Sequence, residues 1–494
     1  MNRRGRLTIA VLVGLGFASG WWAAQQVAAS MARPAAGAPL AGPAAAGEEA
    51  PAPVASPATP PPSGALAAVS DPPPEPAEPR PVEVAATPAP RPASEPASAG
   101  APRPMPPAPP QVPDEILRRL PPSARADGTA ALASGRLVER VAAPAGASDI
   151  QGPLDVEYTL DPWLNGRVGE ILRRDQVELA HVIVLDPNDG RVLAYVSTNP
   201  TSFPPTRAYP MASLMKVVTA AALLQHKPDV VERPCHFTGN PYYLSARLLD
   251  PPRAGHIATF EHALAMSNNQ CFAQFAVHEL GAPSVIDELR RLGVLEAPAP
   301  GHASGEIDPV ETRLDLGELG SGLAGTRIAP LTAVRLAAAL AEGQLVVPRW
   351  IARVTDASGL ALAMPDVQTP RPALEPRITR WLRSMLVETT ERGTARRGFH
   401  PGGRALLSPI RVAGKTGSLN GTDPEGRYEW FIGVAPAEAP RVAVATLLVN
   451  RGRWHRSASQ LAAEVLQAVF CSDGVCREDW RRSARSSERA APRG

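Results

Sequence analysis

A segment that carries one serine and one lysine on a single predicted helix constrains this chain most. Residues 210–218 read Pro-Met-Ala-Ser-Leu-Met-Lys-Val-Val, and an uncharged run continues to Leu224. A helix that is apolar on every side is a buried helix. Ser213 and Lys216 are three residues apart, so they lie next to each other on one helical face. We expect desolvation to lower the pKa of Lys216, which places a neutral amine beside a hydroxyl group.

This arrangement supports nucleophilic catalysis. A neutral lysine acts as a general base, the serine oxygen becomes the nucleophile, and the helix N-terminus adds positive potential where an oxyanion forms. The same short pattern also occurs without any chemistry, when the serine caps the helix and the lysine extends to the surface. The choice between the two interpretations depends on the rest of the chain.

The N-terminal part of the chain is rich in proline and poor in large apolar residues. Residues 31–112 consist mainly of Ala, Pro, Glu and Ser, and such a segment cannot bury a core. We predict a disordered or polyproline-like tether there. The whole chain of 494 residues has a formal net charge of +2, which gives no electrostatic case for a nucleic-acid partner. No Cys-x-x-Cys or His-Glu-x-x-His pattern occurs, so we expect no zinc site.

Residues 1–30 combine a basic start with an apolar run. The uncharged stretch from Leu7 to about Ala24 follows several arginines and is just long enough to span a bilayer. The arginines predict a cytoplasmic stub, and the catalytic part of the chain is then periplasmic or otherwise extracytoplasmic. We therefore expect a single-pass anchor in the cytoplasmic membrane, with a cleaved signal peptide as the alternative.

We predict one folded region at residues 155–476. A short, poorly defined connector at residues 113–154 precedes it, and a polar, arginine-rich tail at residues 477–494 follows it. The alternating pattern of Val156–Leu160 opens the folded region as a strand, and a hairpin at residues 180–197 follows.

Helical patterns dominate the middle of the folded region, and strand patterns return toward its end. Helices are expected at Pro162–Arg174, Phe260–Leu292, Pro330–Glu342 and Ser457–Phe470, and later strands at Arg411–Gly414, Trp430–Ala435 and Arg441–Val449. This order predicts an α+β fold, in which the terminal strands join in one antiparallel sheet flanked by helices, beside an all-helical subdomain.

Two further short motifs complete a constellation with the serine and lysine of the buried helix. Ser267-Asn268-Asn269 ends a helix-like segment, and Lys415-Thr416-Gly417-Ser418 ends a predicted strand. Together they supply a second hydroxyl for proton relay, an amide for holding a peptide backbone, and a second lysine. Because Gly417 has no side chain, an extended substrate is able to pair with the strand. The hydroxyl groups of Thr416 and Ser418 suit a terminal carboxylate.

In this order, Ser-x-x-Lys, Ser-x-Asn and Lys-Thr-Gly are motifs of penicillin-binding proteins and β-lactamases. Over roughly residues 155–470, the sequence resembles the transpeptidase domain of penicillin-binding proteins. The resemblance extends beyond the motifs to further segments: Val156–Asp161, Val184–Ala194, Ile328–Leu331, Ala341–Gly343, Gly393–Ala395 and Trp430–Gly433.

The resemblance implies a catalytic role for each motif residue. Ser213 is the acylated nucleophile, and Lys216 is its general base. Ser267 relays a proton to the leaving group, and Lys415 orients Ser267 and adds positive field. Asn269 holds the substrate amide.

The resemblance also implies how the substrate is bound and what it is. Thr416, Gly417 and Ser418 bind the substrate, and the backbone N–H groups of Ser213 and Ser418 form the oxyanion hole. The family's substrate is the D-Ala-D-Ala end of a peptidoglycan stem peptide. The acyl-enzyme passes to an amine of a neighbouring stem, and β-lactams trap the serine. No metal or organic cofactor is implied, and cell-wall synthesis proteins are expected as partners.

Other functions share these motifs. A serine β-lactamase or a D,D-carboxypeptidase hydrolyses its acyl-enzyme, and one β-lactamase class uses the glutamate of a Glu-x-x-Leu-Asn motif. The segment Glu311–Asp315 comes close to that motif, a match that we attribute to chance. A non-enzymatic β-lactam sensor or scaffold domain is the remaining alternative.

The cysteines suit an oxidising compartment. Cys471 and Cys476 are close enough in sequence to close a small loop, and Cys235 and Cys271 either pair or stay free. A bridge to Cys271, two residues after Asn269, would brace the candidate site.

Overall fold

The computed structural model of the chain describes residues 108–452 and 456–477. The predicted membrane segment, most of the predicted tether and nearly all of the predicted tail lie outside these residues. Within them, no helix combines the length and the apolarity that crossing a membrane requires.

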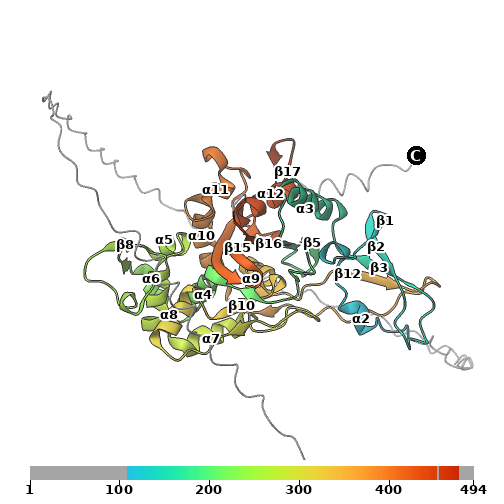
Figure 1. The fold of residues 1–494 in the computed structure, drawn as a ribbon, viewed down its shortest axis with the longest axis horizontal. Coiled ribbons are helices and arrows are strands. Elements are labelled where there is room, and N and C mark those ends of the chain that lie inside the picture. Colours follow the sequence, from blue (N-terminus) through green and yellow to red (C-terminus); the bar gives the residue numbers. More distant parts are fainter. Residues whose placement is uncertain (1–107, 453–455, 478–494) are drawn as a thin grey trace, which may run out of the picture. The chain divides into compact units, whose positions relative to one another are not determined.

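A five-stranded antiparallel sheet joins the two ends of the predicted folded region (Figure 1). Its strand order is β14 (Ala413–Thr422), β15 (Glu425–Ala435), β16 (Val442–Asn450), β4 (Ala180–Leu185) and β5 (Val192–Ser197). β16 pairs with β4, so the late strands and the early hairpin form one sheet. The predicted α+β fold is confirmed, and the hairpin at residues 180–197 joins the late strands in one antiparallel sheet, whereas the first predicted strand lies in another sheet.

Side chains that alternate along the sheet strands enter two separate cores. On one face, Val182 packs in a cluster with residues of α3 (Pro162–Arg174) and α12 (Ala458–Phe470). On the other face, Ile183 packs in a cluster with residues of α9 (Pro330–Glu342). The predicted helices at the positions of α3 and α9 are confirmed with the bounds that were expected.

The helical region is built around the helix that carries the first motif. α4 (Met215–His226) continues from η2 (Ala212–Leu214), and it contacts α7 (Gly281–Arg291), α8 (Arg313–Ser321) and α10 (Pro376–Glu391). All of α4 except its last two residues is buried, as its uncharged sequence predicted.

The connector predicted at residues 113–154 is folded, so the predicted start of the folded region is wrong. β1 (Ala131–Ala133) and β2 (Arg136–Val141) pair in order with β3 (Leu154–Tyr158), and β12 (Ile351–Thr355) completes a four-stranded sheet. β1 is exposed along its whole length and β2 buries few side chains. The apolar alternation that marks a strand in a sequence is therefore weak here.

A buried carboxylate helps to hold this second sheet. Glu139 accepts hydrogen bonds from Arg119 at 2.7 Å, from Arg125 at 2.5 Å and from the hydroxyl of Tyr158 at 2.6 Å. These contacts join residues that are distant in sequence, so no local pattern predicts them. The strand predicted at Val156–Leu160 belongs to this sheet and not to the five-stranded one.

Candidate active site

Ser213 lies on a tight turn at the start of the buried helix. It is the middle residue of η2, and α4 begins two residues later at Met215. The preceding residue, Ala212, has a φ of 52°, in the left-handed region, which costs a non-glycine residue about 1 kcal/mol or more. Strained backbone of this kind concentrates at functional sites, where the surrounding structure holds it in place. The turn places Ser213 in the wall of a cleft.

Lys216 reaches back to Ser213 from the first turn of α4. Its side chain is fully buried, and its Nζ lies 3.0 Å from Oγ of Ser213. The same Nζ lies 2.6 Å from Oδ1 of Asn269 and 2.5 Å from the backbone oxygen of Ser321. Desolvation by burial, and then the positive charge of Lys415, hold the pKa of Lys216 well below its ordinary value.

The hydrogen-bond partners of Lys216 fix the orientation of its amine. A neutral amine has two N–H donors and one lone pair. The Oδ1 of Asn269 and the backbone oxygen of Ser321 can only accept, so they take both N–H groups. A charged Nζ donates to Oγ of Ser213. Once the amine is neutral, its lone pair is left for Ser213, whose hydroxyl then donates to Nζ. This is the arrangement of a general base beside its nucleophile.

Ser267 lies at a break between two short helices, α5 (Phe260–Ala265) and α6 (Asn269–Gln274). Its φ of 59° is again in the left-handed region. The Oγ of Ser267 lies 2.9 Å from Nζ of Lys415, which is fully buried in β14. Burial lowers the pKa of Lys415 from 10.5 to about 7. A second serine–lysine pair therefore borders the cleft.

Asn269 is held at both ends of its side-chain amide. Its Oδ1 contacts Lys216, and its Nδ2 donates a 2.7 Å hydrogen bond to the backbone oxygen of Tyr242. The sequence predicts that Asn269 holds a substrate amide. The structure adds a second task, because the same side chain positions the amine of Lys216.

β14 forms the opposite wall of the cleft. The sequence placed the Lys415–Ser418 motif at the end of a strand, but β14 pairs with β15 along its whole length, so the motif lies in mid-strand. β14 is also an edge strand of the sheet. A Cβ atom on Gly417 would lie 3.4 Å from Cβ of Ala212 and from the backbone nitrogen of Leu214. The strand therefore runs directly alongside η2.

The hydroxyl groups of the β14 motif already have partners in the cleft. Oγ1 of Thr416 lies 2.6 Å from Oγ1 of Thr394, and Oγ of Ser418 accepts a 3.0 Å hydrogen bond from Arg427. The two backbone N–H groups predicted to form an oxyanion hole, those of Ser213 and Ser418, belong to the facing elements η2 and β14.

One cleft of about 910 Å³ brings the predicted site residues together. The predicted residues that line it are Ser213, Ser267, Asn269, Thr416, Gly417 and Ser418. Lys216 and Lys415 lie behind them, with no exposed surface.

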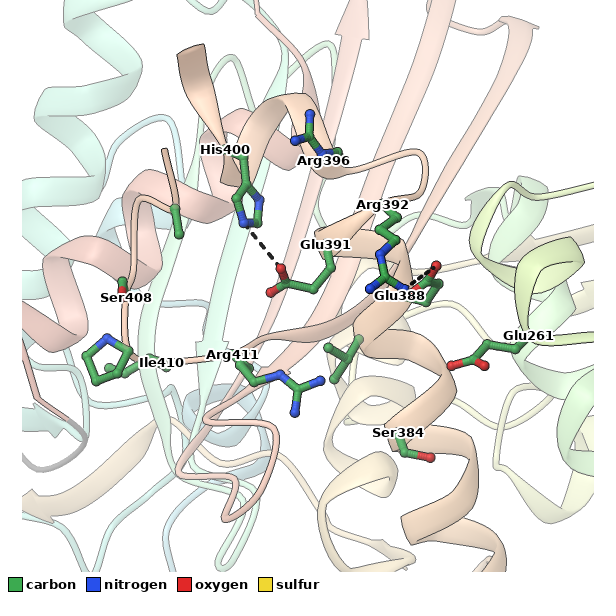
Figure 2. A pocket seen from close by; sticks show the side chains of 13 residues that line it. Glu261, Ser384, Glu388, Glu391, Arg392, Arg396, His400, Ser408, Ile410 and Arg411 are labelled. Carbon is green, nitrogen blue, oxygen red and sulfur yellow. Dashed lines mark hydrogen bonds and ion pairs between the residues drawn. The ribbon is translucent and has the colours of Figure 1, made fainter. Parts of the chain in front are cut away.

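A second hollow of about 640 Å³ lies beside α10 (Figure 2). Several of its charged side chains pair with one another: Glu391 with His400 at 3.3 Å, and Glu388 with Arg392 at 3.2 Å. No lysine is among the described residues that line this hollow. The residues that the sequence predicted for the site line the first cleft or lie behind it, and none of them lines this hollow.

The sequence model described as the penicillin binding protein transpeptidase domain matches residues 180–470, which is more than half of the chain. The chain belongs to this family. A curated relative, the peptidoglycan D,D-transpeptidase PbpA of Mycobacterium tuberculosis, is 27% identical over 331 residues. That match covers 58% of this chain and 66% of the relative, so it spans just under two thirds of the relative's length.

Solved structures share the fold of this penicillin-binding transpeptidase domain. The imipenem acyl-enzyme complex of penicillin-binding protein A from M. tuberculosis has a TM-score of 0.54 and 22% identity, and the match covers 64% of this chain and 79% of that one. The D,D-transpeptidase domain of a peptidoglycan glycosyltransferase from Eggerthella lenta also has a TM-score of 0.54, with 20% identity. That match covers 70% of this chain and 94% of the Eggerthella lenta chain.

Three groups in this penicillin-binding transpeptidase site were not predicted from the sequence. Ser321 and Tyr242 each contribute a backbone oxygen, which every residue has, so no sequence signal marks them. Thr394 contributes its hydroxyl. It lies within Gly393–Ala395, a segment that resembles the family but to which the sequence analysis gave no role.

Glu311 does not belong to the site. It is exposed, and it is not among the described residues that line the cleft. The aspartate that completes its motif, Asp315, instead caps α8: its side chain accepts from the backbone N–H of Thr312 at 2.8 Å. The interpretation of this motif as a chance match agrees with the structure.

Both cysteine pairs form disulfide bonds. Cys235 in β7 (Cys235–Phe237) is bonded to Cys271 in α6, and Cys471 is bonded to Cys476. The first bond ties a β-hairpin to the helix that begins with Asn269. Among the described residues, no group of histidine, cysteine, aspartate and glutamate side chains is arranged to hold a metal ion.

Proposed function

We propose that this chain is a serine D,D-transpeptidase that cross-links peptidoglycan stem peptides through an acyl-enzyme at Ser213, and that β-lactams acylate the same serine. The observation that carries the proposal is the position of the buried amine of Lys216, which lies 3.0 Å from Oγ of Ser213 and is held there by Asn269 and the backbone oxygen of Ser321. The curated relative named as a peptidoglycan D,D-transpeptidase supports the reaction class, and the imipenem acyl-enzyme complex of a structural relative supports the covalent intermediate.

In the first half of the reaction, Oγ of Ser213 attacks the carbonyl carbon of the penultimate D-alanine while its proton moves to Lys216. The developing oxyanion accepts hydrogen bonds from the backbone N–H groups of Ser213 and Ser418. The C–N bond to the terminal D-alanine then breaks. The proton held by Lys216 passes to the leaving nitrogen through Ser267, which Lys415 holds in place.

In the second half, an amine of a neighbouring stem peptide attacks the acyl carbon. It loses a proton to Lys216, and Ser213 leaves as a free hydroxyl. Asn269 and the edge of β14 hold the donor peptide in an extended form throughout, whereas Thr416 and Ser418 hold its terminal carboxylate only in the first half, before the terminal D-alanine leaves. Transfer to water in place of the amine would make the protein a D,D-carboxypeptidase.

We place the catalytic domain outside the cytoplasm, on a single membrane anchor formed by residues 1–30. The two disulfide bonds support an oxidising compartment, because such bonds rarely persist in a reducing cytosol. The proline-rich residues before Pro110 then act as the tether between membrane and enzyme. The predicted tether ends too late at residue 112, because Gln111 and Val112 already pair with Ala363 and Val112 is buried in the core. Proteins of cell-wall synthesis are the proposed partners.

A labelling time course tests the proposed function. The full chain is incubated with a fluorescent penicillin, and the protein-bound label is followed after excess reagent is removed. We expect a label that persists for many minutes on the wild type and is absent from Ser213→Ala. Ser384→Ala, which removes a serine from the second hollow, serves as the matched control and keeps the label.

Each other outcome has a definite meaning. Full labelling of a folded Ser213→Ala variant would refute the nucleophile. Label that clears within seconds would identify a β-lactamase. Persistent label combined with release of D-alanine, but no joined product when an amine acceptor is present, would identify a carboxypeptidase.

A further inference from the structure

The cleft carries more positive than negative charge. Three arginines line it, Arg397, Arg427 and Arg456, together with a single carboxylate, that of Glu429. Arg427 is committed to Glu429 at 3.1 Å and to the hydroxyl of Ser418. Arg456 forms ion pairs with two acidic residues that do not line the cleft. Only Arg397 among the three has a guanidinium group without a hydrogen bond or ion pair to any described residue.

The backbone of Arg397 is firmly held although its side chain is exposed. It lies on α11 (Arg396–Phe399), which packs against α12. At the next residue, Gly398, an added Cβ would come within 2.7 Å of the backbone carbon of Ser459, so the two helices touch with no side chain between them. An arginine on such a support presents its charge to the cleft at a small cost in backbone entropy.

Arg397 also lies close in sequence to the hydroxyl groups expected to meet a carboxylate. It follows Thr394 by three residues, and Oγ1 of Thr394 lies 2.6 Å from Oγ1 of Thr416. The hydroxyl of Thr394 has a second acceptor, the backbone oxygen of Ala265 at 3.3 Å, so the pair leaves an O–H for a ligand, that of Thr416, when Thr394 donates to Thr416. Ser418 accepts from Arg427, so its own O–H also remains. The hydroxyl groups in the cleft thus supply neutral hydrogen-bond donors, and the guanidinium group of Arg397 supplies a positive charge.

We propose that Arg397 binds the terminal carboxylate of the donor peptide and thereby selects donors that end in a free carboxyl group. The inference rests on the proposed function and names a specificity residue within it. A carboxylate that leaves water for a cleft loses hydration, and neutral hydroxyls replace only part of it. A guanidinium group is always charged and offers paired N–H donors that match both carboxylate oxygens.

The experiment compares two donor peptides that both end in D-Ala-D-Ala, one with a free carboxyl terminus and the other with a terminal carboxamide. Release of the last residue by the full chain gives kcat/KM for each. We expect Arg397→Ala to lose about tenfold on the carboxylate donor, the value of one charge-assisted hydrogen bond. The loss appears mainly in KM, the carboxamide donor changes less than twofold, and Arg397→Lys recovers part of the loss.

The neighbouring residue supplies a matched control. Arg396 lies on the same short helix with the same charge and is also exposed, but it lines the second hollow and not the cleft (Figure 2). Arg396→Ala should behave as the wild type with both donors. A second measurement uses benzylpenicillin and its methyl ester, and follows acylation alone, so it does not depend on peptide turnover. The wild-type preference for the charged compound should shrink as salt is added.

The possible results separate the inference from the proposed function. A wild type that penicillin does not acylate refutes the proposed function itself. If the wild type is acylated, equal losses on both donors in Arg397→Ala refute carboxylate recognition and indicate a structural role. The inference is also refuted if Arg397→Ala keeps the wild-type preference for the carboxylate donor over the carboxamide donor. The same holds if the variant is impaired only in transfer to the amine acceptor.

Discussion

Replacing Lys415 with methionine removes a buried amine while keeping a long apolar side chain. Lys415 is fully buried, and its Nζ contacts Oγ of Ser267 and the backbone oxygen of Thr416, each at 2.9 Å. Burial lowers its pKa from 10.5 to about 7 in the folded protein. The variant therefore separates the effect of this lysine on the acylation rate from its effect on the free energy of unfolding.

The sign of the effect follows from proton counting. Between pH 7 and about 10.4, the unfolded lysine keeps a proton that the folded lysine has released. The free energy of unfolding of the wild type consequently rises with pH by about 1.4 kcal/mol per unit, and this contribution is missing in Lys415→Met. At pH 8 the lowered pKa of Lys415 reduces the free energy of unfolding of the wild type by about 3 kcal/mol. The hydrogen bonds of Lys415 to Ser267 and to the backbone oxygen of Thr416 each raise the free energy of unfolding by about 1 kcal/mol.

We therefore expect Lys415→Met to be the more stable protein at pH 8 and to lose that advantage as the pH approaches 10. Urea unfolding followed by circular dichroism at half-unit steps from pH 7.5 to 9.5 measures the difference. Lys227→Met, at an exposed lysine, is the control, and its stability difference should stay constant. Acylation of Lys415→Met by penicillin should fall about 100-fold. A stability difference that is the same at every pH would refute the reasoning, because it would mean that Lys415 stays charged in the fold.

Three further predictions concern residues around the site and one residue outside it. Changing both Cys235 and Cys271 to serine opens a loop with a sequence separation of 36 and should lower the free energy of unfolding by about 3 kcal/mol, which denaturant unfolding measures. Acylation should also become slower, because α6 carries Asn269. Unchanged labelling kinetics would contradict the role of the disulfide bond in bracing the site. Gly417→Val places its branches in the 3.4 Å gap toward η2 and should slow acylation about 100-fold in a folded protein, as stopped-flow labelling would show. Glu311→Gln should leave the lifetime of the penicilloyl-enzyme unchanged, and a longer lifetime in mass spectra would restore the β-lactamase interpretation.

Local patterns predicted the helices that bury a continuous apolar face. The uncharged run after Lys216 predicted a buried helix, and the periodicity at Pro162–Arg174 and Pro330–Glu342 predicted helices with the observed bounds. A helix buried on one face leaves a periodic apolar signal in the sequence, and a helix buried on nearly all sides leaves an unbroken one.

Local patterns failed where the structure depends on long-range polar contacts. β1 and β2 show little apolar alternation, and the carboxylate of Glu139 is stabilised by residues from other segments. The Lys415–Ser418 motif was placed at a strand end because its small and polar residues end the apolar run. Pairing with β15 extends the strand beyond it.

The sequence by itself predicted which side chains carry the chemistry, because Ser213 and Lys216 are spaced within one helical turn and the two later motifs supply the remaining groups. Only the tertiary structure decided what those side chains do to one another. The partners of Lys216 lie 53 and 105 positions away, and the Ser267–Lys415 contact spans 148. Desolvation and hydrogen-bond direction, which set the pKa values and orient the lone pair, arise only when such distant segments pack together.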